Sequence, residues 1–215
     1  MIKRTIETSL TPHLIINECL GNLVVRGDAQ ERITVSVHGS DNEVGWELEG
    51  DTLTLSVPGN GSLLCPSGTT LTIKKVLGNL RVERLVGPAA VAAVHGNTTL
   101  RAVGPVSLDG VLGNLSAREV AGQLEAQDVR GNVRVRGVGA ELLLGGVAGN
   151  LVADGLQDGL RVDTVRGNAR LGPDFFPNTT LRLRGYANLT VLVPASASLR
   201  VALRAGGQAL SLIHI

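Results

Sequence analysis

Aromatic residues are almost absent from this sequence: its 215 residues include one Trp, one Tyr and two Phe. Aromatic side chains supply much of the buried area in most globular proteins, so a thick globular core of the usual kind is excluded. The chain is still 43% hydrophobic, which excludes a mostly disordered polymer. The interior must therefore be built from Val, Leu, Ile and Ala, a composition that suits thin stacked layers.

An excess of one charge and long hydrophobic runs are also lacking. The formal net charge of +1 gives no reason to expect nucleic acid, a membrane surface or an acidic polymer as an obligate partner, so any partner must be inferred from local features. No apolar run approaches the roughly 18 residues of a membrane span. The start, MIKRTIETSLTPHLII, has polar residues where a signal peptide needs an apolar stretch. We therefore expect a cytoplasmic chain by default, or a surface location if the sequence is a fragment.

Cysteine is scarce, since only Cys19 and Cys65 occur, without a CxxC pair or a Cys/His cluster. Two thiols, of which at least one is buried, are expected in preference to a disulfide or a metal site. No cofactor and no metal are expected.

What the sequence has in abundance is glycine, and it recurs with asparagine at a fixed period. Gly-Asn pairs follow one another at steps of 18, 17, 18, 18 and 18 residues. These pairs are Gly78-Asn79, Gly96-Asn97, Gly113-Asn114, Gly131-Asn132, Gly149-Asn150 and Gly167-Asn168. Each period splits into two halves of about nine residues, and most halves have apolar residues at the fourth, sixth and ninth places.

Apolar residues two apart mark one face of a strand, and a glycine between such strands marks a corner. One such unit cannot bury its inner face alone, but two units form a flattened coil that stacks on the next coil. The sequence predicts an all-β, single-stranded β-solenoid with coils of about 18 residues.

The interior of this solenoid follows from the repeat. The first strand is expected to contribute the stack Leu80, Thr98, Leu115, Val133, Leu151 and Ala169 and the stack Val82, Leu100, Ala117, Val135, Ala153 and Leu171. The second is expected to contribute Ala89, Val106, Leu124, Leu142 and Leu160, together with Val91, Leu108, Ala126, Leu144 and Val162. A corner stack of Val94, Val111, Val129, Val147 and Val165 closes the section.

The corner residues are predicted to be structural. Glycine is expected there because φ can be positive, and asparagine because it tolerates a left-handed backbone. The asparagine amide can also donate to and accept from the coils above and below. A row of asparagines that binds a ligand is the alternative.

Four segments are expected along the chain. Residues 1–75 form early coils or a cap continuous with the rod, with Gly21-Asn22 as a corner and Gly39 following 18 residues later. Residues 76–174 form the regular solenoid, and 175–209 form irregular coils. The tail 210–215, which ends in LSLIHI, resembles a translated sequencing adaptor. Trp46 is expected to pack over the open end of the core, and a sugar-stacking role is the alternative.

No catalytic constellation is apparent. Calcium-binding nine-residue repeats need Asp at the sixth place, where this chain has Val, Ala or Leu, so that type of calcium site is excluded. Asp109, Asp128 and Asp163 are the acids available to a polysaccharide-active enzyme, but they fall on different coils without flanking aromatics. We expect no catalytic residues.

Arginine gives the one patterned surface feature. Arg101, Arg118 and Arg136 recur at the same outward place, and Arg81, Arg134 and Arg170 recur at the neighbouring place. This row is a candidate for gripping an anionic polymer through carboxylate or phosphate contacts. Glu83 and Asp154 interrupt the row, however, and a solvated face that keeps an exposed sheet from aggregating is the preferred interpretation.

The segments GNLVVRG (21–27), LGNLRVERL (77–85), RGNVRVRGV (130–138), CPSGTTLTIKKVLGNL (65–80) and VPASASLRVAL (193–203) carry a family resemblance. Over roughly residues 13–205 the chain resembles a bacterial adhesin-like β-solenoid family of unknown function, in which a Gly-Asn or Gly-Asp corner precedes a V-x-V strand. The resemblance implies the fold and a non-enzymatic role. It brings no catalytic residues, and the leader or membrane segment of many such proteins is not apparent here.

The first functional hypothesis is therefore an adhesin-like rigid surface that binds or displays, with a repetitive surface polymer or a protein as partner. The second is a self-assembling scaffold like the bacterial bactofilins, whose short β-helices join end to end. A polysaccharide-active enzyme ranks third.

Overall fold

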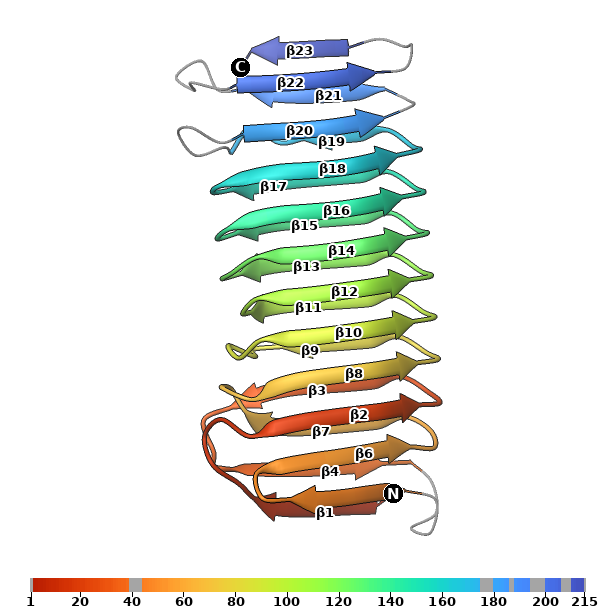
Figure 1. Cartoon of the computed structure of the whole chain (residues 1–215), viewed down its shortest axis with the longest axis vertical. Helices are drawn as coiled ribbons and strands as arrows, with labels where there is room; N and C mark the ends of the chain where they lie inside the picture. Colours follow the sequence, from red (N-terminus) through yellow and green to blue (C-terminus); the bar gives the residue numbers. More distant parts are fainter. Residues whose placement is uncertain are drawn as a thin grey trace.

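The chain folds into a rod made of two facing β-sheets, as Figure 1 shows. The computed structural model describes residues 2–38, 44–174, 180–185, 188–193, 200–205 and 210–214. Within these residues all regular secondary structure is β-strand, and no helix occurs. The all-β prediction is confirmed.

Each sheet runs the length of the rod. In the described residues, sheet A has twelve strands, in the spatial order β1-β4-β7-β3-β9-β11-β13-β15-β17-β19-β21-β23. They are β1 (Ile2–Glu7), β3 (Leu23–Asp28), β4 (Arg32–Val37), β7 (Gly61–Pro66), β9 (Leu80–Glu83), β11 (Thr98–Val103), β13 (Leu115–Val120), β15 (Val133–Val138), β17 (Leu151–Leu156), β19 (Ala169–Leu171), β21 (Leu189–Val193) and β23 (Leu210–His214).

Sheet B faces it with eleven described strands, in the order β22-β20-β18-β16-β14-β12-β10-β8-β2-β6-β5. They are β2 (His13–Cys19), β5 (Gly45–Glu49), β6 (Thr52–Val57), β8 (Thr70–Val76), β10 (Ala89–Val94), β12 (Val106–Val111), β14 (Leu124–Val129), β16 (Glu141–Val147), β18 (Gly159–Val165), β20 (Thr180–Gly185) and β22 (Arg200–Ala205).

Successive coils of the regular segment lie directly over one another. Leu115 pairs with Val133 and Val133 with Leu151, in parallel. On sheet B, Leu124 pairs with Leu142 in the same way. Each coil contributes one strand to each sheet, so the β-solenoid with 18-residue coils is confirmed.

The core fills the narrow space between the two sheets. A typical six-residue strand turns its first, third and sixth residues inward, as Thr98, Leu100 and Val103 do in β11. Every residue of the interior stacks expected from the sequence is at most 5% exposed. A further buried stack, at the corner opposite the stack that begins with Val94, was not expected, although its members also occupy the ninth place of a half-repeat. They are Leu85, Val103, Val120, Val138 and Leu156.

A left-handed residue lies between the third and sixth residues of successive sheet A strands. φ is 51° at Ala102 and 57° at Glu119, and the same place in the next two coils holds Gly137 at 75° and Gly155 at 64°. This conformation costs a residue with a β-carbon about 1–2 kcal/mol, whereas for glycine the only cost is the larger loss of backbone entropy on folding. The same left-handed backbone conformation is therefore adopted by residues with a β-carbon in two coils and by glycine in the next two.

Exchanging residues at this place should change stability in opposite directions. Ala102→Gly is expected to stabilise the protein by about 1 kcal/mol, and Gly137→Ala to destabilise it by about 1 kcal/mol. A β-carbon on Gly137 would lie no closer than 3.7 Å to its nearest neighbour, the amide nitrogen of Glu119, so crowding does not contribute. Urea unfolding followed by circular dichroism measures both changes, and two shifts of the same sign would contradict the explanation.

The corner glycines are required by the close approach of neighbouring coils. The expected positive φ is wrong, because none of the six predicted corner glycines is left-handed. The amide of Gly131 instead donates to the carbonyl oxygen of Gly113 at 3.0 Å, and a β-carbon on Gly131 would lie 2.5 Å from that oxygen. Only a hydrogen atom fits between the stacked corners.

Asparagine side chains beside these glycines are hydrogen-bonded along the rod. Oδ1 of Asn114 accepts from the backbone N–H of Asn132 at 2.8 Å and from its Nδ2 at 3.1 Å. Bonds of this kind run in spatial order through Asn60, Asn22, Asn79, Asn97, Asn114, Asn132, Asn150 and Asn168. They give a partner to corner N–H groups that strand pairing leaves open.

The first coil of the chain is inserted between two later ones. β2 lies between β6 and β8, and β3 lies between β7 and β9 (Figure 1). The amide of Gly21 donates to the carbonyl of Gly59, so Gly59-Asn60 forms the corner next to Gly21-Asn22. Gly39, the corner expected from the spacing, lies outside the described residues.

A short connection carries the chain past this inserted coil. After β7, the N–H of Ser67 donates to the carbonyl of Asp28 at 2.7 Å, at the end of the first coil. The carbonyl of Ser67 accepts from Val86 and Gly87, which follow the coil on the other side. Thr69 is fully buried and donates its hydroxyl to Pro66. The three coils are thus tied together by residues far apart in sequence.

Antiparallel strands cover the end of the rod near the N-terminus. β1 pairs with β4, β4 with β7, and β5 with β6, each in the antiparallel sense. Trp46 of β5 packs against the core, and the guanidinium carbon of Arg4 in β1 lies 3.6 Å from the centre of its ring. Trp46 therefore joins the two sheets at this end, which is the packed position expected for it.

Candidate binding surface

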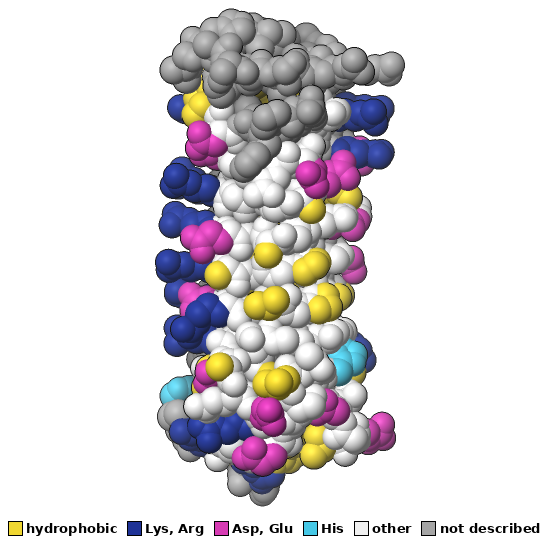
Figure 2. Space-filling view, turned by 90° about the vertical axis from the view of Figure 1, so that its left-hand side faces the viewer, with side chains coloured by type: hydrophobic (Ala, Val, Ile, Leu, Met, Phe, Trp, Pro, Cys, Tyr) yellow, Lys and Arg dark blue, Asp and Glu magenta, His cyan; other side chains and the backbone are white. Residues whose placement is uncertain are grey.

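The outward face of sheet A carries arginines in two columns along the rod. Arg101, Arg118 and Arg136 are register partners on β11, β13 and β15, so their backbones are about 4.8 Å apart. Arg134 and Arg170 lie in the neighbouring column, with Val152 between them. Figure 2 shows Lys and Arg side chains in a row along one long edge of the rod. These five exposed residues are called the arginine stripe.

The guanidinium groups of the arginine stripe lack carboxylate partners in the described part of the chain. Arginine stays charged at all accessible pH values, and its planar fork matches the geometry of carboxylate and phosphate groups. The stripe can therefore contact several anionic groups in a line, and its members repel one another until it does.

Carboxylates stand at both ends of the main arginine column. Asp154 is the register partner of Arg136, and Glu83 is the register partner of Arg101. Glu83 is held in place by two cations: its Oε2 accepts from Nε of Arg26 at 3.0 Å, and its Oε1 accepts from Nε of Arg81 at 2.6 Å. In this column the unpaired arginines therefore lie on β11, β13 and β15, and Arg170 of the neighbouring column lies further along, on β19.

The ion-paired carboxylate of Glu83 makes the stability of the fold depend on pH in the acid range. The hydrogen bond from Arg81, with that from Arg26, holds the pKa of the 9%-exposed Glu83 below its usual value. A lowered pKa stabilises the fold above the unfolded value of about 4.3, and this contribution is lost as pH falls through the folded pKa. We expect Glu83→Gln to be less stable than the native chain at pH 7 and equally stable at the acid end. Urea unfolding across this range tests it, and a pH-independent difference would contradict it.

The same coils carry the opposite charge on sheet B. Asp109 lies on β12, Glu125 and Asp128 on β14, and Glu141 at the start of β16. These four residues are called the acidic patch, and β12, β14 and β16 contain no Lys or Arg. The middle of the rod is thus basic on one face and acidic on the other.

The structure does not gather the candidate catalytic acids. Asp109 and Asp163 share a column but are separated by Gln127 and Gly145, and Asp128 lies in the next column. A shallow hollow of about 250 Å³ on sheet B is lined by Glu125, Gln127, Arg161 and Asp163, among others. A second, of about 290 Å³, is lined largely by small residues of β8, β10 and β12.

The two cysteines are core residues. Both Cys19 and Cys65 are fully buried and carry free thiols. Burial raises the pKa of Cys19 and raises that of Cys65 to about 11, so neither is a thiolate at neutral pH. In the part of the chain that the structure describes, no group of three or more His, Cys, Asp or Glu side chains is placed to hold a metal ion.

One ion pair beside the arginine stripe could not be predicted from the repeat. Arg26 reaches Glu83 across 57 residues because the first coil is inserted beside β9. Aligning the similar segments GNLVVRG and GNLRVERL places Arg26 at the same position as Glu83. The sequence therefore shows that the two residues occupy equivalent places in their coils, but not that these coils are neighbours.

Known proteins offer few points of comparison for this chain. No family model matches the chain, and no curated protein matches it. A putative cell adhesion protein from Clostridium sporogenes aligns over 99% of this chain and 97% of its own, at 12% identity and a TM-score of 0.27. At that score the two structures do not superimpose, so the fold assignment rests on the strand register described above. No helix in the described residues is long and apolar enough to cross a membrane.

Proposed function

We propose that this protein is a non-enzymatic, adhesin-like binding module that holds an extended anionic polymer along the arginine stripe. The observation that carries the proposal is the alignment of Arg101, Arg118 and Arg136 on consecutive strands without any carboxylate partner among the described residues. A polymer with regularly repeated carboxylate or phosphate groups fits this chemistry.

The mechanism is the addition of weak contacts along a rigid surface. Each exposed arginine contributes little alone, because water and salt screen it. The coils hold the guanidinium groups at a fixed axial interval, so binding of one anionic group places its neighbours beside the next arginine. Affinity should therefore rise steeply with ligand length and fall with salt.

Isothermal titration with short and long oligouronates tests this function. The triple variant Arg101→Ala, Arg118→Ala, Arg136→Ala is expected to lose most of the affinity for the long oligomer. The control variant Lys74→Ala, Arg161→Ala, Arg182→Ala removes the same charge from sheet B and should bind like the native chain. Equal loss in the two variants, or an affinity independent of length, would refute the proposal.

The other two hypotheses have weaker support. End-to-end assembly of the bactofilin kind needs open terminal coils, and the antiparallel strands β1 and β5 cover the end near the N-terminus. The exposed residues of these strands include Lys3 and Glu47, charges that discourage edge pairing. An enzyme needs convergent acids, and Asp109, Asp128 and Asp163 lie on separate strands. Turnover of polysaccharides that is lost in Asp128→Ala would revive the enzyme hypothesis.

A further inference from the structure

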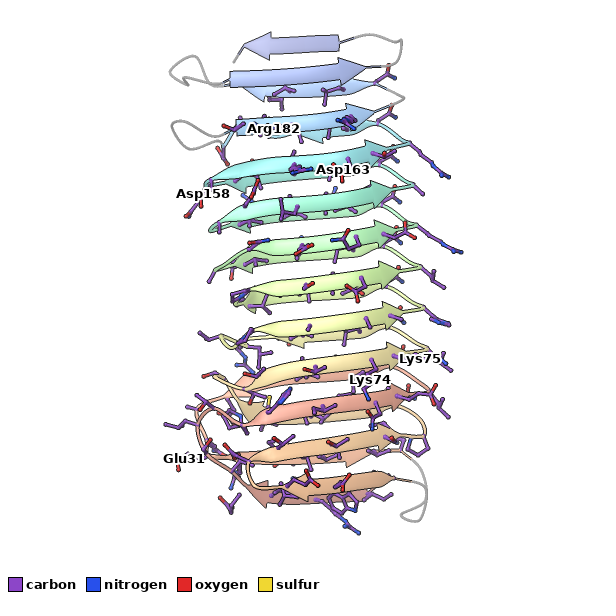
Figure 3. All side chains as sticks on the ribbon, viewed as in Figure 1. Glu31, Lys74, Lys75, Asp158, Asp163 and Arg182 are labelled. Carbon is purple, nitrogen blue, oxygen red and sulfur yellow. The ribbon has the colours of Figure 1, made fainter. Side chains whose placement is uncertain are left out.

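The acidic patch and the arginine stripe occupy matching lengths of the rod on opposite faces. The stripe is strongest on β11, β13 and β15, and the acidic patch lies on β12, β14 and β16. Cations bound the acidic patch on both sides: Lys74 and Lys75 on β8, and Arg182 on β20, which Figure 3 shows on the same sheet. Each face is therefore a pattern of charges with a defined beginning and end.

The two patterns are complementary when the sheet A face of one rod meets the sheet B face of another. With β11 opposite β12, Arg101 faces Asp109. With β13 opposite β14, Arg118 faces Glu125 and Asp128, and the exposed Glu119 beside Arg118 offsets part of this attraction. On β16, Glu141 lies at the start of the strand, outside the columns of Arg134 and Arg136. On the next pair of strands, Asp154 faces Arg161 and its ion-pair partner Asp163. Because both faces share one coil spacing, all these pairs form together.

We propose that copies of this chain associate side by side, the arginine stripe of one against the acidic patch of the next. The contact joins two different faces, so it is heterologous and leaves one basic and one acidic face free at the ends of a row. Such rows grow by addition of further copies. This goes beyond the binding function proposed above, and it uses the same arginines, so an anionic polymer and a second copy compete for the stripe.

The charge pattern sets the axial register to within one coil. With β13 opposite β12 and β15 opposite β14, Arg118 faces Asp109, and Arg134 and Arg136 face Glu125 and Asp128. Larger shifts leave fewer pairs of opposite charge and are therefore less favourable.

Sedimentation velocity with the full chain, in the absence of polymer, tests the association. At low salt the sedimentation coefficient should rise with protein concentration, and the association constant should fall at least about tenfold between roughly 20 and 500 mM NaCl, where the Debye length shrinks from about 20 to about 4 Å. A monomer at every concentration in low salt would overturn the proposal.

A charge exchange distinguishes this contact from nonspecific attraction. Variant one carries Arg101→Glu, Arg118→Glu and Arg136→Glu, and variant two carries Asp109→Lys, Glu125→Lys and Asp128→Lys. Each variant alone has two faces of like charge and should remain monomeric, whereas an equal mixture should associate. A mixture that stays monomeric, or single variants that associate like the native chain, would overturn the proposal. Variant two keeps the stripe, so its polymer binding reports on the proposed function separately.

Cross-linking tests the register without changing any charge. Ser116 on β13 and Gln127 on β14 point outward on opposite faces of one rod, so a linker with a reach of about 10 Å joins Ser116→Cys to Gln127→Cys only between copies. The expected product is a ladder of covalent oligomers. The control pair, Ser116→Cys with Thr54→Cys on β6, is five strands out of register, about 24 Å, and should give none. Equal cross-linking of both pairs would overturn the proposed register.

Discussion

Replacing Gly131 with alanine is expected to destabilise the protein by about 3 kcal/mol or more. The new β-carbon would lie 2.5 Å from the carbonyl oxygen of Gly113, 2.6 Å from its carbon and 2.7 Å from Oδ1 of Asn114. Two of these atoms belong to the backbone of the preceding coil and are held by strand pairing on both sides. The coils can accept the methyl group only by separating, which breaks hydrogen bonds at the corner. Urea unfolding followed by circular dichroism measures the loss.

Gly110→Ala is the matched control for this change. Gly110 lies on a strand of the same regular segment, and a β-carbon there would meet its nearest atom, the carbonyl oxygen of Ala92, at 3.6 Å. That is ordinary van der Waals contact, so a change within about 0.5 kcal/mol is expected. Similar stabilities for the two variants would show that the corner does not need glycine.

Asn132→Ala is expected to cost about 2 kcal/mol. Oδ1 of Asn132 accepts from the backbone N–H of Asn150 at 2.9 Å and from its Nδ2 at 3.1 Å. Its own Nδ2 donates to Asn114. Alanine removes all three bonds and leaves the N–H of Asn150 with only solvent to accept from it. Thermal and urea unfolding measure the effect.

The control for Asn132 is Gln123, an exposed amide in the adjacent coil whose side chain forms no hydrogen bond among the described residues. Gln123→Ala should change stability by less than about 0.5 kcal/mol. If Asn132→Ala is no more costly than this control, the hydrogen bonds along the corner contribute nothing to stability.

The stacking of the regular segment could be predicted because one period fixes both register and burial. When Leu115, Val133 and Leu151 recur every 18 residues, a coil of that length places them over one another, and alternation along each strand decides which residues face inward. The arginine stripe follows by the same logic, since Arg101, Arg118 and Arg136 are one coil apart.

The order of the first coils could not be predicted, because every coil presents similar edges to its neighbours. Leu23 pairs equally well with Gly61 and with Leu80, and nothing in a repeat states which coil lies next to which. Chain order is only a default. The corner glycines show a second limit of prediction from the repeat. The pattern located them correctly, but glycine is required there because neighbouring coils come into close contact, which a single repeat cannot reveal.

The acidic patch was missed for a different reason. Asp109 and Asp128 invite a search for catalytic pairs when they are considered one at a time. Their common property is that they lie on sheet B, opposite the arginines, and this becomes visible only when alternate half-repeats are grouped by sheet.

The insertion of the first coil constrains how the rod is made. Residues 13–28 leave the ribosome early, yet the strands that flank them, β6 and β7 on one side and β8 and β9 on the other, are complete only after Glu83 has been synthesised. The first 83 residues must therefore close as one cooperative block, whereas each later coil can add to a finished edge in turn. Loss or duplication of a whole coil between residues 89 and 171 would leave the preceding coils intact as an edge for later strands to pair with. The same event before residue 83 would disrupt the block on which every later coil is stacked.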